Sequence, residues 1–205
     1  MADEIGDTGG ADAIKIAQWL IRRTDADKVF IDCGAHIGAV GIPVALKTSP
    51  HLAIFVEPDS RAFKVLEQNV KEANLKNYLL INKAIADKTG TVTLNLGTLA
   101  AHSSLVIGKD KKQIEVEAIT IDDIIEAYAE KRRVVIKMDI EAAEPLAWQG
   151  MQKHLDQIDA MAMEYMAEYI PNAGEFYAEV RHKFLMQFIT GNNLDHKCDL
   201  GFIKP

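Results

Sequence analysis

The stretch Val29–Gly38, with the sequence VFIDCGAHIG, decides the fold of this 205-residue chain. Three apolar residues that favour strands run into Asp32, a glycine-bearing turn follows, and an apolar run from Ala39 to Leu46 comes next. This order predicts a strand, a tight turn and a helix. Because ligands of doubly wound α/β sheets sit at the carboxyl ends of the strands, we expect a ligand at this turn.

The spacing of the glycines limits which ligand this turn can hold. A dinucleotide-binding turn needs a second glycine two residues after the first, so that pyrophosphate can approach the backbone, and here that position is His36. A Walker loop is excluded because no Gly-Lys-Ser/Thr sequence follows. An acid followed by Gly34 and Gly38 suits a ligand with an amino acid at one end, such as S-adenosylmethionine. The alternative is a purely structural strand-to-helix turn.

A second acidic strand end follows at Glu57. The apolar segment His51–Val56 is a predicted strand, and it ends at Glu57-Pro58. A carboxylate at the tip of the second strand can accept hydrogen bonds from both ribose hydroxyls of a nucleoside. The alternative is an acid that only begins a surface turn before the next helix.

Composition and charge narrow the class of protein. The length suits one domain, and we expect residues 11–205 to form it and residues 1–10 to be a flexible tail. The net charge of −7 makes nucleic acid an unlikely partner. The two cysteines, Cys33 and Cys198, give no disulfide framework, and no apolar run approaches the ~20 residues of a membrane span. Without a secretion signal at its start, the chain is expected to be cytoplasmic; nothing indicates the oligomeric state.

Strand-like and helix-like segments alternate along the chain. The predicted helices cover residues 11–23, 39–46, 61–75, 121–129, 142–155 and 176–189, and the predicted strands residues 29–32, 51–56, 78–84, 91–96, 115–120, 134–141, 160–163 and 196–203. This alternation predicts an α/β fold with a doubly wound, mostly parallel sheet and helices on both faces.

The predicted strand 134–141 changes abruptly from apolar to charged. Lys137, Asp139 and Glu141 share one parity, so their side chains point to one side if the chain stays extended. Glu144 follows one helical turn later. Because charges are costly to bury unless paired, these groups indicate either a functional site or a salt-bridged strand end in which Lys137 neutralises Asp139.

Three kinds of chemistry fit Asp139 and Glu141. Methyl transfer is an in-line displacement in which positioning can supply ~7–11 kcal/mol. A carboxylate that holds or deprotonates an acceptor hydroxyl would add general-base catalysis. Paired carboxylates could instead hold a hard cation such as magnesium. The sequence does not decide whether a divalent metal is needed, and no metal ligands are assigned.

The ordered set of motifs resembles the FkbM family of S-adenosylmethionine-dependent methyltransferases. The matching segments are residues 32–38, 55–58, Asn69, 84–87, Ser103-Ser104, 137–144, Gly150 and Glu164. Each motif is modest, but their order along the chain is specific. The resemblance implies a class I methyltransferase fold of the Rossmann-like type and transfer to a hydroxyl oxygen, usually of a sugar or secondary metabolite.

The resemblance also implies roles for individual residues. The first turn would lie near the methionine part of the cofactor, Glu57 on the ribose, and Ala84 with its neighbour Asn82 near the adenine. Asp139 and Glu141 would be catalytic residues at the transfer site. The predicted cofactor-binding set is Asp32, Gly34, Ala35, His36, Gly38, Glu57, Asn82, Ala84, Ser104 and Asp139.

The chain departs from the family pattern at two positions. His36 stands where the family commonly has asparagine, and Ala142 stands where it commonly has glycine. The methyl group of Ala142 could narrow the acceptor pocket or disfavour a positive φ. A class I sheet would also need two strands after Glu164, and only residues 196–203 form a convincing candidate.

Three functional hypotheses follow. The leading one is an O-methyltransferase that acts on a hydroxyl of a small molecule. The second is an RNA or protein methyltransferase on the same fold, against which stand the acidic charge and the absence of an Asn/Asp-Pro-Pro-Tyr segment. The third is a non-catalytic module that binds S-adenosylmethionine, suggested by Ala142 and the short C-terminal part.

Overall fold

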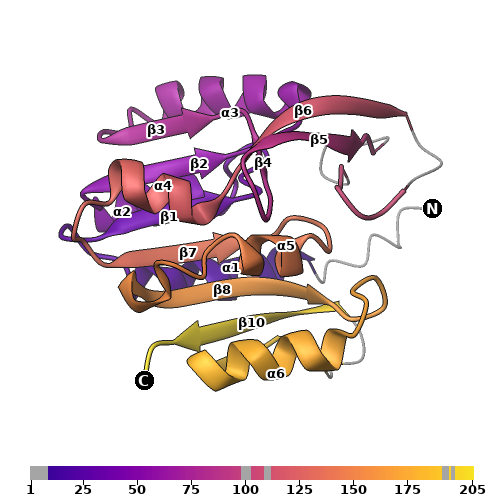
Figure 1. The fold of residues 1–205 in the computed structure, drawn as a ribbon. Coiled ribbons are helices and arrows are strands. Elements are labelled where there is room, and N and C mark those ends of the chain that lie inside the picture. The colour runs from indigo at the N-terminus through magenta and orange to yellow at the C-terminus, as the bar shows by residue number, and fades with distance from the viewer. Residues whose placement is uncertain (1–8, 98–102, 109–111, 191–193, 195–196) are drawn as a thin grey trace, which may run out of the picture.

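A computed structural model describes residues 9–97, 103–108, 112–190, 194 and 197–205 of the chain. Within these residues a seven-stranded sheet has the order β3-β2-β1-β7-β8-β10-β9 (Figure 1). Its strands are β1 (Val29–Cys33), β2 (Leu52–Val56), β3 (Tyr78–Ile81), β7 (Val134–Met138), β8 (Ile158–Met166), β9 (Leu185–Ile189) and β10 (Lys197–Ile203). Strands β3, β2, β1, β7 and β8 are parallel, and β10 runs antiparallel to β8 and β9. This confirms the predicted doubly wound, mostly parallel sheet.

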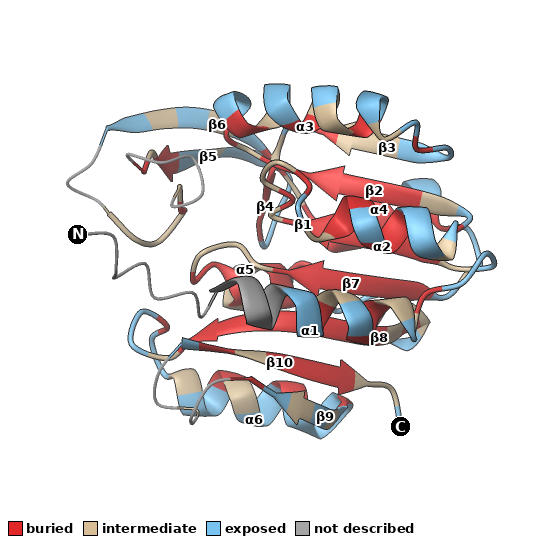
Figure 2. Cartoon of the chain, turned by 180° about the vertical axis from the view of Figure 1, so that it is seen from behind, coloured by how far each residue is buried: buried red, intermediate tan, exposed pale blue. Residues whose placement is uncertain are grey.

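Helices cover both faces of this sheet. One face carries α4 (Ile121–Tyr128), α5 (Glu144–Gln149) and α6 (Ala173–Lys183), and the other carries α1 (Gly9–Ile21), α2 (Gly41–Thr48) and α3 (Ser60–Glu72). Figure 2 shows the buried central strands between exposed helix surfaces. All five residues of β1 and of β7 are buried, which explains their nearly continuous apolar sequences.

A second, three-stranded sheet lies beside the first and has the order β4-β6-β5 (Figure 1). Its strands are β4 (Ala84–Ile85), β5 (Gly90–Asn95) and β6 (Gln113–Ile119). The predicted strand 78–84 is therefore two strands that belong to different sheets. The chain leaves the main sheet at Asn82, whose side-chain amide donates hydrogen bonds to the carbonyls of Glu57 (2.7 Å) and Pro58 (3.2 Å).

The prediction of one helix over residues 176–189 is wrong. Helix α6 ends at Lys183, and β9 follows as an edge strand paired with β10. Exposed and half-buried residues alternate along β9, and the half-buried Phe188 packs against Trp19 of α1. Gly201 of β10 makes this possible, because a Cβ there would lie 2.0 Å from the Phe188 ring. The sheet thus has the second C-terminal strand that the sequence did not reveal.

The predicted helix 142–155 is also shorter than expected. Helix α5 covers only Glu144–Gln149, and a short 3₁₀ helix, Leu155–Gln157, precedes β8. Of the predicted tail, residues 1–8 lie outside the described part of the chain, whereas Gly9 and Gly10 belong to α1. No helix among the described residues combines the length and apolar character needed to cross a membrane.

Candidate active site

Two turns at the carboxyl ends of β1 and β7 interlock. The amide of Asp139 donates a 3.1 Å hydrogen bond to the carbonyl of Cys33. Gly34 has a φ of +74°, and a Cβ at this position would lie 1.8 Å from the carbonyl oxygen of Asp139. Only glycine fits at position 34, because the backbone of the turn after β7 occupies the space that a Cβ would need.

A buried ion pair lies beneath the interlocked turns. The Nζ of Lys137 is 3.1 Å from Oδ1 of Asp32 and 3.6 Å from Oδ2 of Asp139, and it donates a 2.9 Å hydrogen bond to the carbonyl of Gly34. Burial alone would lower the pKa of Lys137, but the carboxylates of Asp32 and Asp139 outweigh it and raise that pKa. Lys137 therefore stays charged and joins the two turns, and its closer carboxylate partner is Asp32 rather than Asp139.

Glu57 organises the loop after β2. Its Oε2 accepts a 2.9 Å hydrogen bond from the amide of His36, and its Oε1 accepts a 2.8 Å bond from the amide of Asp59. Burial raises the pKa of Glu57 to about 7, although both backbone bonds favour the charged form. Each carboxylate oxygen has a second lone pair with which it can accept a hydrogen bond from a ligand hydroxyl.

A pocket of about 200 Å³ opens at this end of the sheet. The predicted site residues that line it are Gly34, His36, Glu57, Ala84, Ser104, Asp139 and Glu141. The others lie behind this lining: Asp32, Ala35 and Gly38 are buried, and Asn82 holds the loop after β2. The structure thus brings most of the predicted residues together from five segments that are distant in the sequence.

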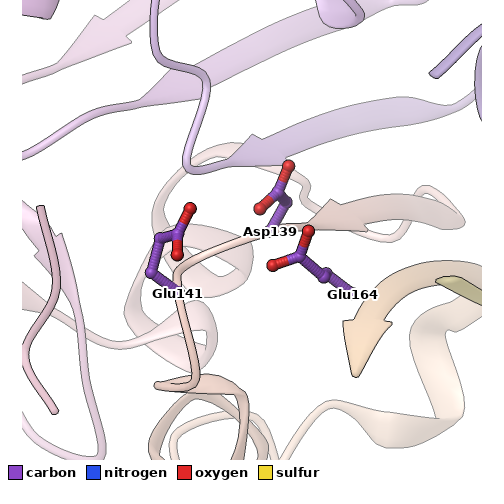
Figure 3. Close-up of side chains that lie close together, drawn as sticks. All are labelled: Asp139, Glu141 and Glu164. Carbon is purple, nitrogen blue, oxygen red and sulfur yellow. The ribbon is translucent and has the colours of Figure 1, made fainter. Parts of the chain in front are cut away.

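Three carboxyl groups meet in the wall of the pocket (Figure 3). Asp139, Glu141 and Glu164 each offer an oxygen, and these oxygens lie within 4.8 Å of one another. The prediction that Lys137, Asp139 and Glu141 align on one extended strand is wrong, since β7 ends at Met138 and Glu141 has a φ of +56°. The turn itself, held by a 2.6 Å hydrogen bond from Oγ of Ser104 to the carbonyl of Glu141, places the Glu141 side chain.

Both departures from the family pattern occur at positive φ. His36 has a φ of +50° and Ala142 a φ of +68°. Such a backbone conformation costs an ordinary residue roughly 1–2 kcal/mol, a cost that glycine avoids and asparagine tolerates.

Glu144 stabilises the turn after β7, because its Oε1 accepts a 2.9 Å hydrogen bond from the amide of Ile140. Burial raises the pKa of Glu144 to about 8.

Glu164 and Lys197 are pocket residues to which the sequence assigned no role. Their side chains form an ion pair of 2.6 Å. Burial raises the pKa of Glu164 to about 9, and the nearby carboxylate of Asp139 adds to the effect. Glu164 could have been found because it follows the predicted apolar strand 160–163, as Glu57 follows the predicted strand 51–56; in the structure it lies within β8, two residues before the end of that strand. Lys197 carries no such signal, since only the antiparallel pairing of β10 with β8 brings it there.

Another unforeseen network joins the start of α3 to the segment after residue 102. Asp59 is paired with Arg61 at 2.6 Å and accepts a 2.7 Å hydrogen bond from Oγ of Ser103. Although burial acts to raise the pKa of Asp59, the bonds from Arg61 and Ser103 outweigh it and lower that pKa. This network holds Ser103 and its neighbour Ser104 at the rim of the pocket.

A family comparison decides what kind of protein this is. The model of the methyltransferase FkbM domain matches residues 32–203. The chain belongs to the FkbM methyltransferase family. This assignment confirms the enzyme class expected from the sequence, a methyltransferase with S-adenosylmethionine as its methyl donor. Among curated proteins, none matches the chain.

Solved methyltransferase structures share the fold at low sequence identity. An FkbM methyltransferase from Methylobacillus flagellatus is 18% identical with a TM-score of 0.59; the match covers 87% of this chain but only 44% of that protein. An rRNA methylase from Streptococcus thermophilus is 10% identical with a TM-score of 0.57, and the match covers 100% of this chain and 98% of that one. Magnesium protoporphyrin IX methyltransferase from Synechocystis is 11% identical with a TM-score of 0.55, covering 99% and 86%. At these identities the likeness shows the fold alone.

Proposed function

We propose that this FkbM-family chain is an O-methyltransferase that transfers the methyl group of S-adenosylmethionine to a hydroxyl of a small molecule, such as a sugar or secondary metabolite. The main support is that Glu57, at the end of β2, lines the same pocket as the carboxylates of Asp139 and Glu141. A candidate ribose-binding acid and two candidate bases therefore line one cavity, at the edge where α/β sheets bind ligands.

The cofactor would extend across the carboxyl ends of β1 and β2. In this arrangement the backbone of the turn at Gly34 contacts the methionine part, and Glu57 accepts hydrogen bonds from the ribose hydroxyls. Ala84, a small buried residue in the wall of the pocket, leaves room for the adenine. The methyl group would then point toward the turn that carries Asp139 and Glu141.

The chemical step is a displacement at the methyl carbon. The acceptor oxygen forms a bond to this carbon while the bond from carbon to sulfur breaks, and S-adenosylhomocysteine leaves. The hydroxyl proton passes to a carboxylate, for which Asp139 and Glu141 are the candidates because both border the pocket. The remaining contribution is positioning of the acceptor oxygen in line with the leaving sulfur.

The charge of the pocket favours certain acceptors. Asp139, Glu141 and Glu164 present three carboxyl groups, of which Glu164 is paired with Lys197. Without a bound cation, this wall would repel an anionic acceptor, whereas it would not repel a neutral polyol or a cationic compound. We therefore propose a neutral or cationic hydroxyl compound as the substrate.

Two measurements test the proposed function. Mass spectrometry of ligands released from the purified chain should detect S-adenosylmethionine or S-adenosylhomocysteine. A library of sugars and hydroxylated metabolites should then contain a compound that yields S-adenosylhomocysteine and an O-methyl product, with heat-denatured protein as control. A methyl group found on a nitrogen or on RNA would contradict the proposal, and so would cofactor binding without turnover on any hydroxyl compound tested.

A further inference from the structure

We infer that Asp139, Glu141 and Glu164 form a binding site for one divalent cation. One carboxylate oxygen from each residue lies within 4.8 Å of the others. Oxygens on opposite sides of a Mg²⁺ or Ca²⁺ ion, at ~2.0–2.6 Å from it, are about 4–5 Å apart. The three side chains are thus already spaced so that their oxygens can bind the same ion.

The state of Glu164 is a second observation that points to a ligand. Glu164 is only 6% exposed, and its Oε1 is held by Lys197 at 2.6 Å. Its Oε2 is buried and accepts no hydrogen bond from any described residue. Figure 3 shows the Glu164 carboxylate directed toward those of Asp139 and Glu141. Because an unsatisfied buried oxygen is costly, a cation between the three groups would supply the missing partner.

The net charge of the cluster and its surroundings is negative, so a divalent cation could balance it. Ion pairs join the carboxylates of Asp32, Asp139 and Glu164 to the ammonium groups of Lys137 and Lys197, and Glu141 adds a fourth carboxylate. When all three ligands bind as carboxylates, with Glu164 releasing the proton that its raised pKa retains, these four carboxylates and two ammonium groups carry a charge of −2. One divalent cation would neutralise it. Lys137 neutralises little of the cluster's negative charge, since its closest carboxylate is that of Asp32.

The ligand chemistry limits the identity of the ion. All three ligands are carboxylates, which suit Mg²⁺, Mn²⁺ and Ca²⁺, whereas structural zinc sites use cysteine and histidine. The cluster borders the pocket, so open coordination positions would be available to water or to an acceptor hydroxyl. Contact with an acceptor rests on the proposed function, but binding of the cation does not.

A titration with Mn²⁺ tests the site without any assay of activity. The full chain is freed of metal with a chelator, and free Mn²⁺ is followed by electron paramagnetic resonance. We expect saturable binding of one ion per chain with a dissociation constant below ~1 mM, the weak limit of carboxylate sites, and displacement by Mg²⁺ or Ca²⁺. Glu164→Gln should weaken binding at least tenfold. Glu168→Gln, an exposed carboxylate four residues later, should leave it unchanged.

Two further variants guard against misfolding as the explanation. Glu141→Gln changes a half-buried side chain on the turn and should also weaken Mn²⁺ binding, with an unchanged circular dichroism spectrum. Lys197→Met removes the competing ammonium group and should tighten binding several-fold. The inference fails if no saturable binding occurs, if Glu164→Gln and Glu141→Gln bind like wild type, or if Glu168→Gln loses as much affinity as they do. Calorimetry with S-adenosylmethionine on the same samples tests the cofactor site separately.

Discussion

At the scale of single residues, Glu57 combines a structural role that its hydrogen bonds define with the cofactor-binding role that we propose for it. Its oxygens already hold the amides of His36 and Asp59, which fixes the carboxylate in the wall of the pocket. The hydrogen bonds to a ribose would therefore be made by a group that needs no reorganisation. Preorganised acceptors of this kind lose little entropy on binding.

Glu57→Ala should weaken S-adenosylmethionine binding at least tenfold. The expected loss is ~1.5–3 kcal/mol, because hydrogen bonds to a charged acceptor are removed. Isothermal titration calorimetry measures the effect, and Glu126→Ala, an exposed residue of α4, is the control. Equal affinities of Glu57→Ala and wild type would remove Glu57 from the cofactor site.

Asp139→Asn and Glu141→Gln should separate catalysis from cofactor binding. If these carboxylates act on the acceptor, each variant should bind S-adenosylmethionine within a few-fold of wild type and lose ~10²–10⁴ in turnover. Turnover is measured by formation of S-adenosylhomocysteine with the acceptor found in the screen. Full activity in both variants would contradict the catalytic role of these residues. Lower stability with normal activity per folded molecule would instead indicate a structural ion cluster.

Glu144 should make the stability of the chain depend on pH. Burial raises its pKa from 4.5 to about 8, so the folded chain holds a proton that the unfolded chain releases. This bound proton stabilises the folded chain fully below pH 4.5, and the stabilisation is lost as the pH rises toward 8. Glu144→Gln keeps an oxygen for the Ile140 amide and should reduce this decline by ~1–4 kcal/mol, given 1.36 kcal/mol per pKa unit. Urea unfolding between pH 5 and 8 measures it; identical slopes for Glu144→Gln and wild type would refute the assignment.

At the scale of elements, the site depends on how two strand ends approach each other. β1 and β7 are neighbours in register, with Cys33 opposite Met138, so the turns that follow them leave the sheet at the same level. Glycine at position 34 lets these turns cross. The turn after β7 then folds back through the positive φ of Glu141 and Ala142, which brings the Glu141 carboxylate toward the end of β8.

Two glycine substitutions test this dependence on the crossing. Gly34→Ala should destabilise the chain by at least ~2 kcal/mol and abolish cofactor binding, because its Cβ meets the carbonyl oxygen of Asp139 and its φ is positive. Gly174→Ala is the matched control in α6, where a Cβ meets nothing within 4 Å. The control should be neutral or slightly stabilising, by up to ~1 kcal/mol. Thermal unfolding compares the two; a Gly34→Ala chain as stable as wild type would show that the turns can separate without cost.

At the scale of the whole molecule, charge distinguishes the candidate acceptors. The fold is shared with an rRNA methylase as well as with a porphyrin methyltransferase, so fold alone does not identify the acceptor. The chain carries 30 acidic and 23 basic residues, a net charge of −7. Binding to RNA draws most of its affinity from basic groups that neutralise phosphates.

The chain should therefore not bind RNA tightly. In a gel-shift titration with structured RNA at 50–150 mM salt, we expect no complex at protein concentrations below about 1 µM, since non-specific sites on even basic proteins bind at ~10⁻⁴–10⁻⁶ M. A basic RNA-binding protein serves as the positive control. Tight binding that weakens steeply with added salt would contradict the proposed small-molecule acceptor.

The fold class and much of the pocket lining could be read from the sequence because they depend on local patterns. A buried parallel strand is an apolar run, and its carboxyl end is marked by the residue that follows it. Asp32, Glu57 and Asp139 each follow or end such a run. Since parallel strands end at one edge of the sheet, these patterns were enough to predict a common site.

Only the tertiary structure decided which carboxyl groups meet. Glu141 reaches the cluster through a positive φ that no periodicity encodes, and Lys197 reaches Glu164 through the pairing of β10 with β8. The edge strand β9 differs from the prediction for a related reason: its sequence, Leu-Met-Gln-Phe-Ile, follows α6 with no glycine or proline between them, so no local signal separates the strand from the helix. Backbone reversal and strand order depend on contacts between distant segments, and a local pattern contains neither.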